Sequence, residues 1–162
     1  MKYNLFLDDE RRPEDVTWIN PKEGSPGYDS NPLWWTVRNY KDFVRVITKH
    51  GLPSCVSFDH DIDQAHYPWN NPQGIPQYGK YKELTGYEAA KWMCQYAADH
   101  PEQTFPVWDV HSHNPIGKEN IINYITNFLK SRHDSGKLAQ PLVPKTGVLV
   151  GSNPTAATNS NG

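Results

Sequence analysis

Three short apolar runs that stop abruptly in polar residues constrain the fold of this chain more than any other feature. They lie at 5–9, 56–62 and 107–114, and each ends in Asp, His, Ser or Asn. Each run has the length of a buried strand. Because ligands of open α/β sheets bind outside the carboxyl ends of the strands, the three polar endings should line one crevice.

Helix signals alternate with strand signals along the chain and predict an α/β fold. A capping residue precedes each predicted helix: Asn39, Thr85 and Asn114. The helices are expected at 40–50, 86–99 and 115–133, and the strands at 3–7, 33–37, 55–58, 105–110 and 146–150. This alternation predicts a mostly parallel sheet with helices on both faces.

Two long segments, 15–32 and 63–84, carry neither pattern and are rich in Pro, Gly and Asn. Loops of such length are usually functional or disordered. The second holds four aromatic residues, Tyr67, Trp69, Tyr78 and Tyr81. It is predicted to be a lid whose rings stack on a nucleobase, the alternative being a loop that packs on itself.

Size and charge narrow the class of protein. Of the 162 residues, 1–150 are expected to form one domain with insertions at 15–32 and 63–84, and 151–162 a disordered tail. A net charge of −2 argues against binding to duplex DNA through a basic face. With no signal-peptide pattern and no apolar run near the ~20 residues of a membrane span, we expect a cytoplasmic protein away from membranes. The sequence does not determine the oligomeric state.

Carboxylates are the first candidate site residues. Four acids stand at the predicted strand ends: Asp8, Asp9, Asp59 and Asp61. Hard oxygen ligands suit Mg²⁺ or Mn²⁺, and Zn²⁺ becomes an option if an imidazole joins them. We assign Asp8, Asp9 and Asp59 to a divalent metal ion. The structural alternative is that such acids cap helices or accept bonds from loop amides.

Imidazoles and phosphate-binding groups complete the candidate set. His60, His111 and His113 are candidate acids, bases or ligands, unless their rings only bond the backbone. Ser112 and Asn114 could hold a phosphoryl oxygen, although Asn114 before Pro115 is also a helix cap. The helix start near Gly117 offers amide groups to an anion, and Lys118 adds charge. Three arginines could clamp a phosphate: Arg11, nearest the crevice, Arg12 and Arg38.

Taken together, four motifs resemble the cyclic-phosphate-processing receiver-like domains, small bacterial and phage proteins related to the receivers of two-component signalling. The motifs are Leu7 to Pro13, Ser57 to Ile62, Thr85 to Ala90 and Val110 to Gly117. The resemblance implies a receiver-like, flavodoxin-type α/β fold. It implies a site lined by Asp8, Asp9, Asp59, His60, Asp61, His111, Ser112 and Asn114, with Arg11 beside it. Both insertions look longer than in the family, and Lys145 is the nearest counterpart of the late-strand lysine of receivers.

The resemblance and the residues together predict a metal-assisted phosphoesterase that opens a cyclic phosphate. Its substrate would be a 2′,3′-cyclic phosphate RNA end or a cyclic nucleotide. The catalytic candidates are His60 and His111 as base and acid, Asp61 and Ser112; the substrate-binding candidates are Arg11, His113, Asn114, Gly117 and Lys118. Two alternatives are a sponge that binds a cyclic nucleotide without cutting it and a receiver that is phosphorylated on Asp59 or Asp61.

Overall fold

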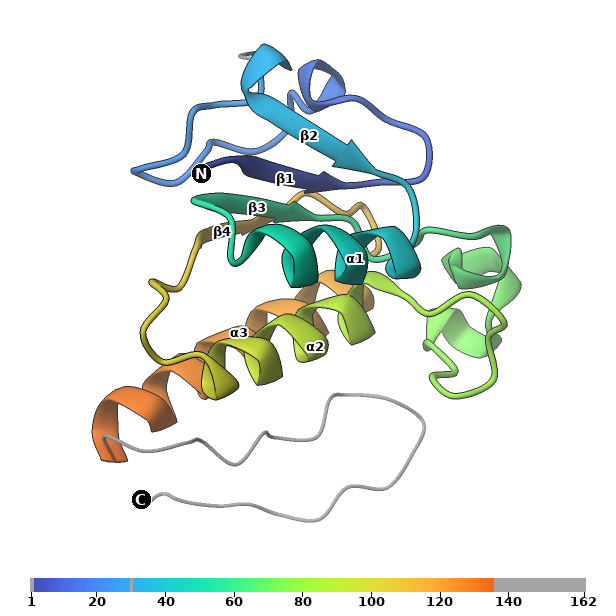
Figure 1. Ribbon diagram of the computed structural model, residues 1–162. Coiled ribbons are helices and arrows are strands. Elements are labelled where there is room, and N and C mark those ends of the chain that lie inside the picture. The colour runs from blue at the N-terminus through green and yellow to red at the C-terminus, as the bar shows by residue number, and fades with distance from the viewer. Residues whose placement is uncertain (1, 30, 136–162) are drawn as a thin grey trace.

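A four-stranded parallel sheet forms the centre of the computed structural model, which describes residues 2–29 and 31–135 (Figure 1). The strands are β1 (Asn4–Leu7), β2 (Trp34–Val37), β3 (Cys55–Phe58) and β4 (Val107–Val110), in the order β2-β1-β3-β4. Leu7 pairs with Phe58, and Phe58 with Val110, so three strands end in register. The expected strand at 146–150, Lys145 and the tail at 151–162 lie outside the described residues.

Three helices begin at the predicted caps: α1 (Tyr40–His50), α2 (Gly86–Asp99) and α3 (Pro115–Ser135). Asn39 accepts the Asp42 amide at 2.8 Å, and Thr85 forms the predicted capping box with Glu88. All three helices cover the same face of the sheet (Figure 1). Their buried side chains form one core with the strand residues of that face, which include Leu5, Leu7, Val56 and Phe58.

The opposite face of the sheet requires a correction to the expectation of helices on both faces. It is covered by the connection from β1 to β2, where Val16 and Tyr28 pack on Phe6 and Cys55. The β1–β2 crossover runs across the sheet in the opposite direction to the two later crossovers, so crossovers of one hand place it on the other face. In its described residues this Pro- and Gly-rich connection forms only two short 3-10 turns, η1 (Pro13–Asp15) and η2 (Asn31–Leu33). The parallel α/β architecture itself is confirmed.

The 63–84 segment projects beyond the carboxyl end of β3 (Figure 1). It contains three 3-10 turns, η3 (Gln64–His66), η4 (Pro68–Asn70) and η5 (Pro72–Gly74). The buried ring of His66 ties its two ends together, because Nδ1 accepts the Ile62 amide at 3.0 Å and Nε2 donates to the Glu83 carbonyl at 2.7 Å. Among the helices that the structure describes, none has the length and apolar character needed to span a membrane.

Candidate functional site

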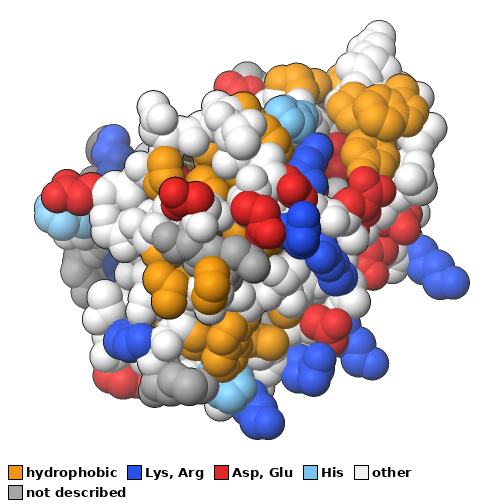
Figure 2. All heavy atoms as spheres, turned by 90° about the horizontal axis from the view of Figure 1, so that it is seen from above, with side chains coloured by type: hydrophobic (Ala, Val, Ile, Leu, Met, Phe, Trp, Pro, Cys, Tyr) orange, Lys and Arg blue, Asp and Glu red, His pale blue; other side chains and the backbone are white. Residues whose placement is uncertain are grey.

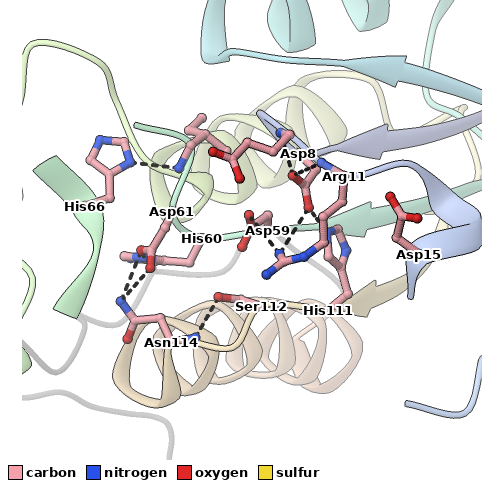
Figure 3. Close-up of polar contacts among 12 residues, drawn as sticks. Asp8, Arg11, Asp15, Asp59, His60, Asp61, His66, His111, Ser112 and Asn114 are labelled. Atoms are coloured by element: carbon pink, nitrogen blue, oxygen red, sulfur yellow. Dashed lines mark hydrogen bonds and ion pairs between the residues drawn. The ribbon is translucent and has the colours of Figure 1, made fainter. Parts of the chain in front are cut away.

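The polar endings of three strands meet at one edge of the sheet, as the sequence predicted (Figure 3). The backbone ladder continues past the strand ends: the Asp59 amide donates to Leu7 and the His111 amide to Phe58, both at 2.9 Å. Asp8, Asp59 and His111 are all buried, and one ligand atom from each lies within 4.8 Å of the others. The three residues therefore form a group that could hold a metal ion, and His111 stands in it where the sequence predicted Asp9.

Asp8 is an ionised carboxylate whose two oxygens both accept hydrogen bonds. Its Oδ1 accepts the amides of Glu10 at 2.9 Å and Arg11 at 2.8 Å, and its Oδ2 lies 2.9 Å from Nε2 of His111. Burial by itself would raise the pKa of Asp8. The hydrogen bonds from His111 and from the two amides outweigh burial and lower the pKa to about 2.

His111 belongs to a buried chain of hydrogen bonds. Because an ionised carboxylate only accepts, Nε2 of His111 carries the proton that it shares with Asp8. Its Nδ1 then accepts from the Ser57 hydroxyl at 2.8 Å, and Ser57 accepts from Tyr28 at 2.7 Å. The imidazole also stacks on Phe6, with centroids 4.5 Å apart. Burial lowers the pKa of His111, so the ring is held rigidly in its neutral form.

The site carries more negative charge than its nearest cation balances. Burial, and then the charges of Asp8 and Asp61, raise the pKa of Asp59 well above its usual value. Arg11 approaches Asp8 at 3.4 Å and Asp59 at 3.7 Å, which compensates only in part. Asp9 lies beside this group, and its buried Oδ1 has no hydrogen-bond partner among the described residues. Burial and the neighbouring carboxylates raise the pKa of Asp9 to about 6.

Arg11 is the arginine that reaches the site. Its guanidinium lies 5.1 Å from the ring centroid of Trp18, whose indole N–H donates to the His111 carbonyl at 2.9 Å. Arg38 instead supports the loop that carries Arg11, by donating to the Asp8 and Arg11 carbonyls at 3.0 and 2.6 Å. Arg12 points to solvent, where it pairs with Glu14 at 3.5 Å.

A second polar cluster lies where β3 meets the start of α3 (Figure 3). His60 has no exposed surface, and both its ring nitrogens are engaged: Nδ1 with Asp61 at 2.5 Å and Nε2 with Tyr78 at 2.7 Å. Asn114 donates from Nδ2 to Asp61 at 3.1 Å and accepts the Gly117 amide at 2.9 Å. The Gly117 amide expected to be free for an anion therefore has a partner, and Asn114 serves as the cap.

Gly117 has a packing role that the sequence did not reveal. A Cβ atom at this position would lie 2.3 Å from Cγ of His60, so the imidazole occupies the space that any side chain would need. Beside it, the buried Ser112 hydroxyl accepts the Asn114 amide at 3.1 Å. The second cluster thus joins α3 to the end of β3 through buried, hydrogen-bonded polar groups.

The chain matches the model of the cyclic-phosphate processing receiver domain over residues 3–127. It belongs to this family. The matched range contains the whole described sheet and every residue of the two clusters. Searches of curated proteins and of solved structures found no match. The strand order β2-β1-β3-β4 and the three helices are consistent with a receiver-like fold.

The remaining predicted residues of the receiver-like domain lie at the rim. His113 is exposed, and its ring packs against Trp18 with centroids 4.0 Å apart and the two planes tilted by 34°. Desolvation, and then the charges of Arg11 and Lys118, lower the pKa of His113. Lys118 is half-buried and also acts electrostatically on Asp109. His113 is thus the exposed member of the three predicted imidazoles, since His60 and His111 are buried.

Three residues that contribute to the site were not predicted for it. Ser57 and Tyr28 complete the chain behind His111, and Trp18 supports both Arg11 and His113. The one available signal was a polar Ser57 inside the apolar run that ends in Asp59. Tyr28 and Trp18 lie in the 15–32 segment, whose composition does not indicate which side chains turn inward.

Proposed function

We propose that this receiver-like domain hydrolyses a cyclic phosphodiester with the help of a divalent cation held by Asp8, Asp59 and His111. The observation that carries the proposal is the group of three buried ligand atoms within 4.8 Å of one another, with Arg11 beside both acids. The family description, cyclic-phosphate processing, supports the substrate class.

A cation suits the chemistry of these residues. Asp59 is a buried carboxylate whose charge is poorly balanced, and Asp9 has an oxygen without a partner among the described residues. Two carboxylates and one imidazole form a donor set that Mn²⁺, Mg²⁺ and Zn²⁺ accept. If His111 used Nε2 as a ligand, its Nδ1 would donate to Ser57, the outer partner that metal-binding histidines usually have. When bound, the ion would polarise the phosphoryl group and lower the pKa of a water molecule.

The protein side chains then bind the phosphate and exchange protons. Arg11 is one-third exposed and rests against Trp18, so its planar donors can meet a phosphate from the solvent side. The sequence assigned the roles of acid and base to His60 and His111. Both are buried with both ring nitrogens engaged, so we assign neither of them as acid or base; His60 is a positioning residue, and His111 remains the candidate metal ligand. His113 is exposed beside Arg11, and we propose that it donates a proton to the leaving oxygen.

A product assay tests hydrolysis. The protein is incubated with cyclic mononucleotides, cyclic dinucleotides and an oligonucleotide that ends in a 2′,3′-cyclic phosphate, with and without EDTA, and the products are weighed by mass spectrometry. We expect one substrate to gain the mass of one water, and EDTA to prevent this. Arg11→Ala should lower kcat/KM about 10²- to 10³-fold, because it removes a preorganised donor to the phosphate. Wild-type activity in Arg11→Ala would contradict this assignment.

Thermal unfolding tests the metal site independently of turnover. Mn²⁺ at about 100 times its dissociation constant should stabilise the folded protein by about 2.7 kcal/mol. Asp59→Asn should abolish that stabilisation. The matched control is Asp109→Asn, because Asp109 is also buried at the sheet but accepts the Lys22 amide, away from the three-residue group. Equal Mn²⁺ stabilisation of Asp59→Asn and the wild-type protein would refute the site.

A binding protein without turnover is the second candidate function. The complete burial of His60 and His111 favours it, because neither ring can exchange a proton directly with a bound nucleotide in this conformation. To test this, the complex is denatured and the released ligand is weighed. An intact cyclic nucleotide, with no product in the mass assay, would show that the protein binds its ligand without hydrolysing it.

A further inference from the structure

The aromatic residues of the 63–84 segment fall into two groups. Tyr78 and Tyr81 are engaged within the fold. Tyr78 stacks on Tyr87 of α2, with centroids 4.6 Å apart, and its hydroxyl bonds His60. Tyr81 donates to Asn71 at 2.6 Å and packs against the ring of His66. For these two residues, packing within the fold explains the aromatic side chain.

Tyr67 and Trp69 form a different arrangement, a stacked pair at the surface. Their rings are parallel to within 5°, with centroids 4.7 Å apart. Trp69 is 74% exposed, more than Leu33 at 56%, the other large hydrophobic side chain exposed in the described residues. An indole left in water forgoes about 1.5–3 kcal/mol of burial free energy, so packing of the fold alone does not account for this residue.

The pair is held in a defined place. Asn71 donates from its side-chain amide to the carbonyls of Ala65 and Tyr67, both at 2.9 Å, which ties η4 to η3. The His66 ring anchors η3 to the Ile62 amide, directly after the second cluster. Both aromatic rings therefore belong to a braced turn attached to the end of β3.

Tyr67 also lies near the charged end of the sheet. Burial, and then the charges of Asp9, Glu10 and Asp59, raise the pKa of Tyr67 to about 12 against the opposing effect of Arg11. The Tyr67 hydroxyl is thus within electrostatic range of the proposed phosphate site. Figure 2 shows hydrophobic side chains projecting on the side where Figure 1 places the 63–84 segment, with acidic and basic side chains next to them.

We propose that Tyr67 and Trp69 form a platform on which the nucleobase of the substrate stacks. The inference rests on the proposed function, and it restricts the substrate to cyclic phosphates that carry a base. The exposed indole offers a flat π face, and Tyr67 supports that face from behind. Because every base has a π face, such a platform predicts weak discrimination among the four bases.

Binding measurements with and without a base test the platform. Adenosine 2′,3′-cyclic phosphate, adenosine 3′,5′-cyclic phosphate and the base-free glycerol 1,2-cyclic phosphate are titrated calorimetrically into the wild-type protein, Trp69→Ala and Trp69→Phe. We expect Trp69→Ala to weaken the better nucleotide about 10- to 100-fold, Trp69→Phe to restore most of the binding, and the base-free ligand to be unaffected. Leu33→Ala, which removes another exposed hydrophobic side chain, should change nothing.

The outcomes separate the platform from hydrolysis. If Trp69→Ala weakens the nucleotide selectively while no substrate is cleaved, the platform stands and hydrolysis fails. If a nucleotide is cleaved with the same KM by the wild-type protein and Trp69→Ala, hydrolysis stands and the platform is wrong. Equal weakening of the base-free ligand, or no nucleotide binding by the wild-type protein at millimolar concentration, would also overturn the platform.

Discussion

Gly117→Ala tests how tightly α3 is joined to the end of β3. The added methyl carbon would lie 2.3 Å from Cγ and 2.5 Å from Nδ1 of His60, whereas carbon atoms pack at about 3.5–4.0 Å. The ring must therefore retreat by about 1 Å. It cannot do so freely, because Nδ1 is bonded to Asp61 at 2.5 Å and Nε2 to Tyr78 at 2.7 Å.

The expected cost follows from these contacts. Overpacking costs about 1–3 kcal/mol, and each strained hydrogen bond of the imidazole adds about 1 kcal/mol. Alanine is the better helix former and returns about 1 kcal/mol. With both hydrogen bonds of the imidazole strained, we therefore expect Gly117→Ala to lower the free energy of unfolding by about 2–4 kcal/mol.

A double-mutant cycle shows whether the imidazole is the cause. Urea unfolding is measured for the wild-type protein, Gly117→Ala, His60→Ala and the double variant. Without the ring the methyl group has room, so Gly117→Ala should be neutral or slightly stabilising in the His60→Ala background. An equal cost of Gly117→Ala in both backgrounds would refute the reasoning.

Two further predictions concern other buried groups. Ser57→Ala should lower the free energy of unfolding by about 2–4 kcal/mol, because it leaves the Tyr28 hydroxyl and Nδ1 of His111 without a partner. Tyr28→Phe leaves the hydrogen bond between Ser57 and His111 in place, so it should lower the free energy of unfolding by less in the same urea titration. A larger loss for Tyr28→Phe than for Ser57→Ala would contradict the hydrogen-bond chain. Burial lowers the pKa of His66 from 6.5, so its contribution to stability is complete above pH 6.5 and declines as the pH falls below it. Between about pH 7.5 and about pH 5, stability should therefore fall more steeply in the wild-type protein than in His66→Gln, and equal slopes would show that the Ile62 amide does not depend on neutral His66.

Much of the fold was predictable because its signals are local. Asn39 and Thr85 accept amides within three residues along the chain, so the starts of α1 and α2 could be identified from sequence. The strand predicted to begin at Leu33 begins at Trp34, and the helix expected to end near His133 ends at Ser135. The face covered by the 15–32 segment was not predicted, because the side chains responsible follow neither helical nor strand periodicity.

The candidate site was predictable in its composition and not in its connections. Asp8, Asp59 and His111 meet as expected from their places after β1, β3 and β4. The groups that hold His111 in place come from far along the chain. Trp18 donates to the His111 carbonyl across 93 residues, and Tyr28 bonds Ser57, the partner of the His111 ring, across 29 residues. No local pattern encodes such pairs, since they depend on how the β1–β2 connection packs on the sheet.

The sequence by itself determined where each strand and helix forms and that the acids and imidazoles gather at the carboxyl ends of the strands. Periodicity and capping act over a few residues, and parallel strands in register must end together. Only the tertiary structure decided which of the candidate side chains are exposed to solvent. His60 and His111 are sealed by long-range partners, whereas His113 and Trp69 keep an exposed surface. Burial and hydrogen bonding depend on the whole packed chain, and they decide which of these groups can meet a ligand.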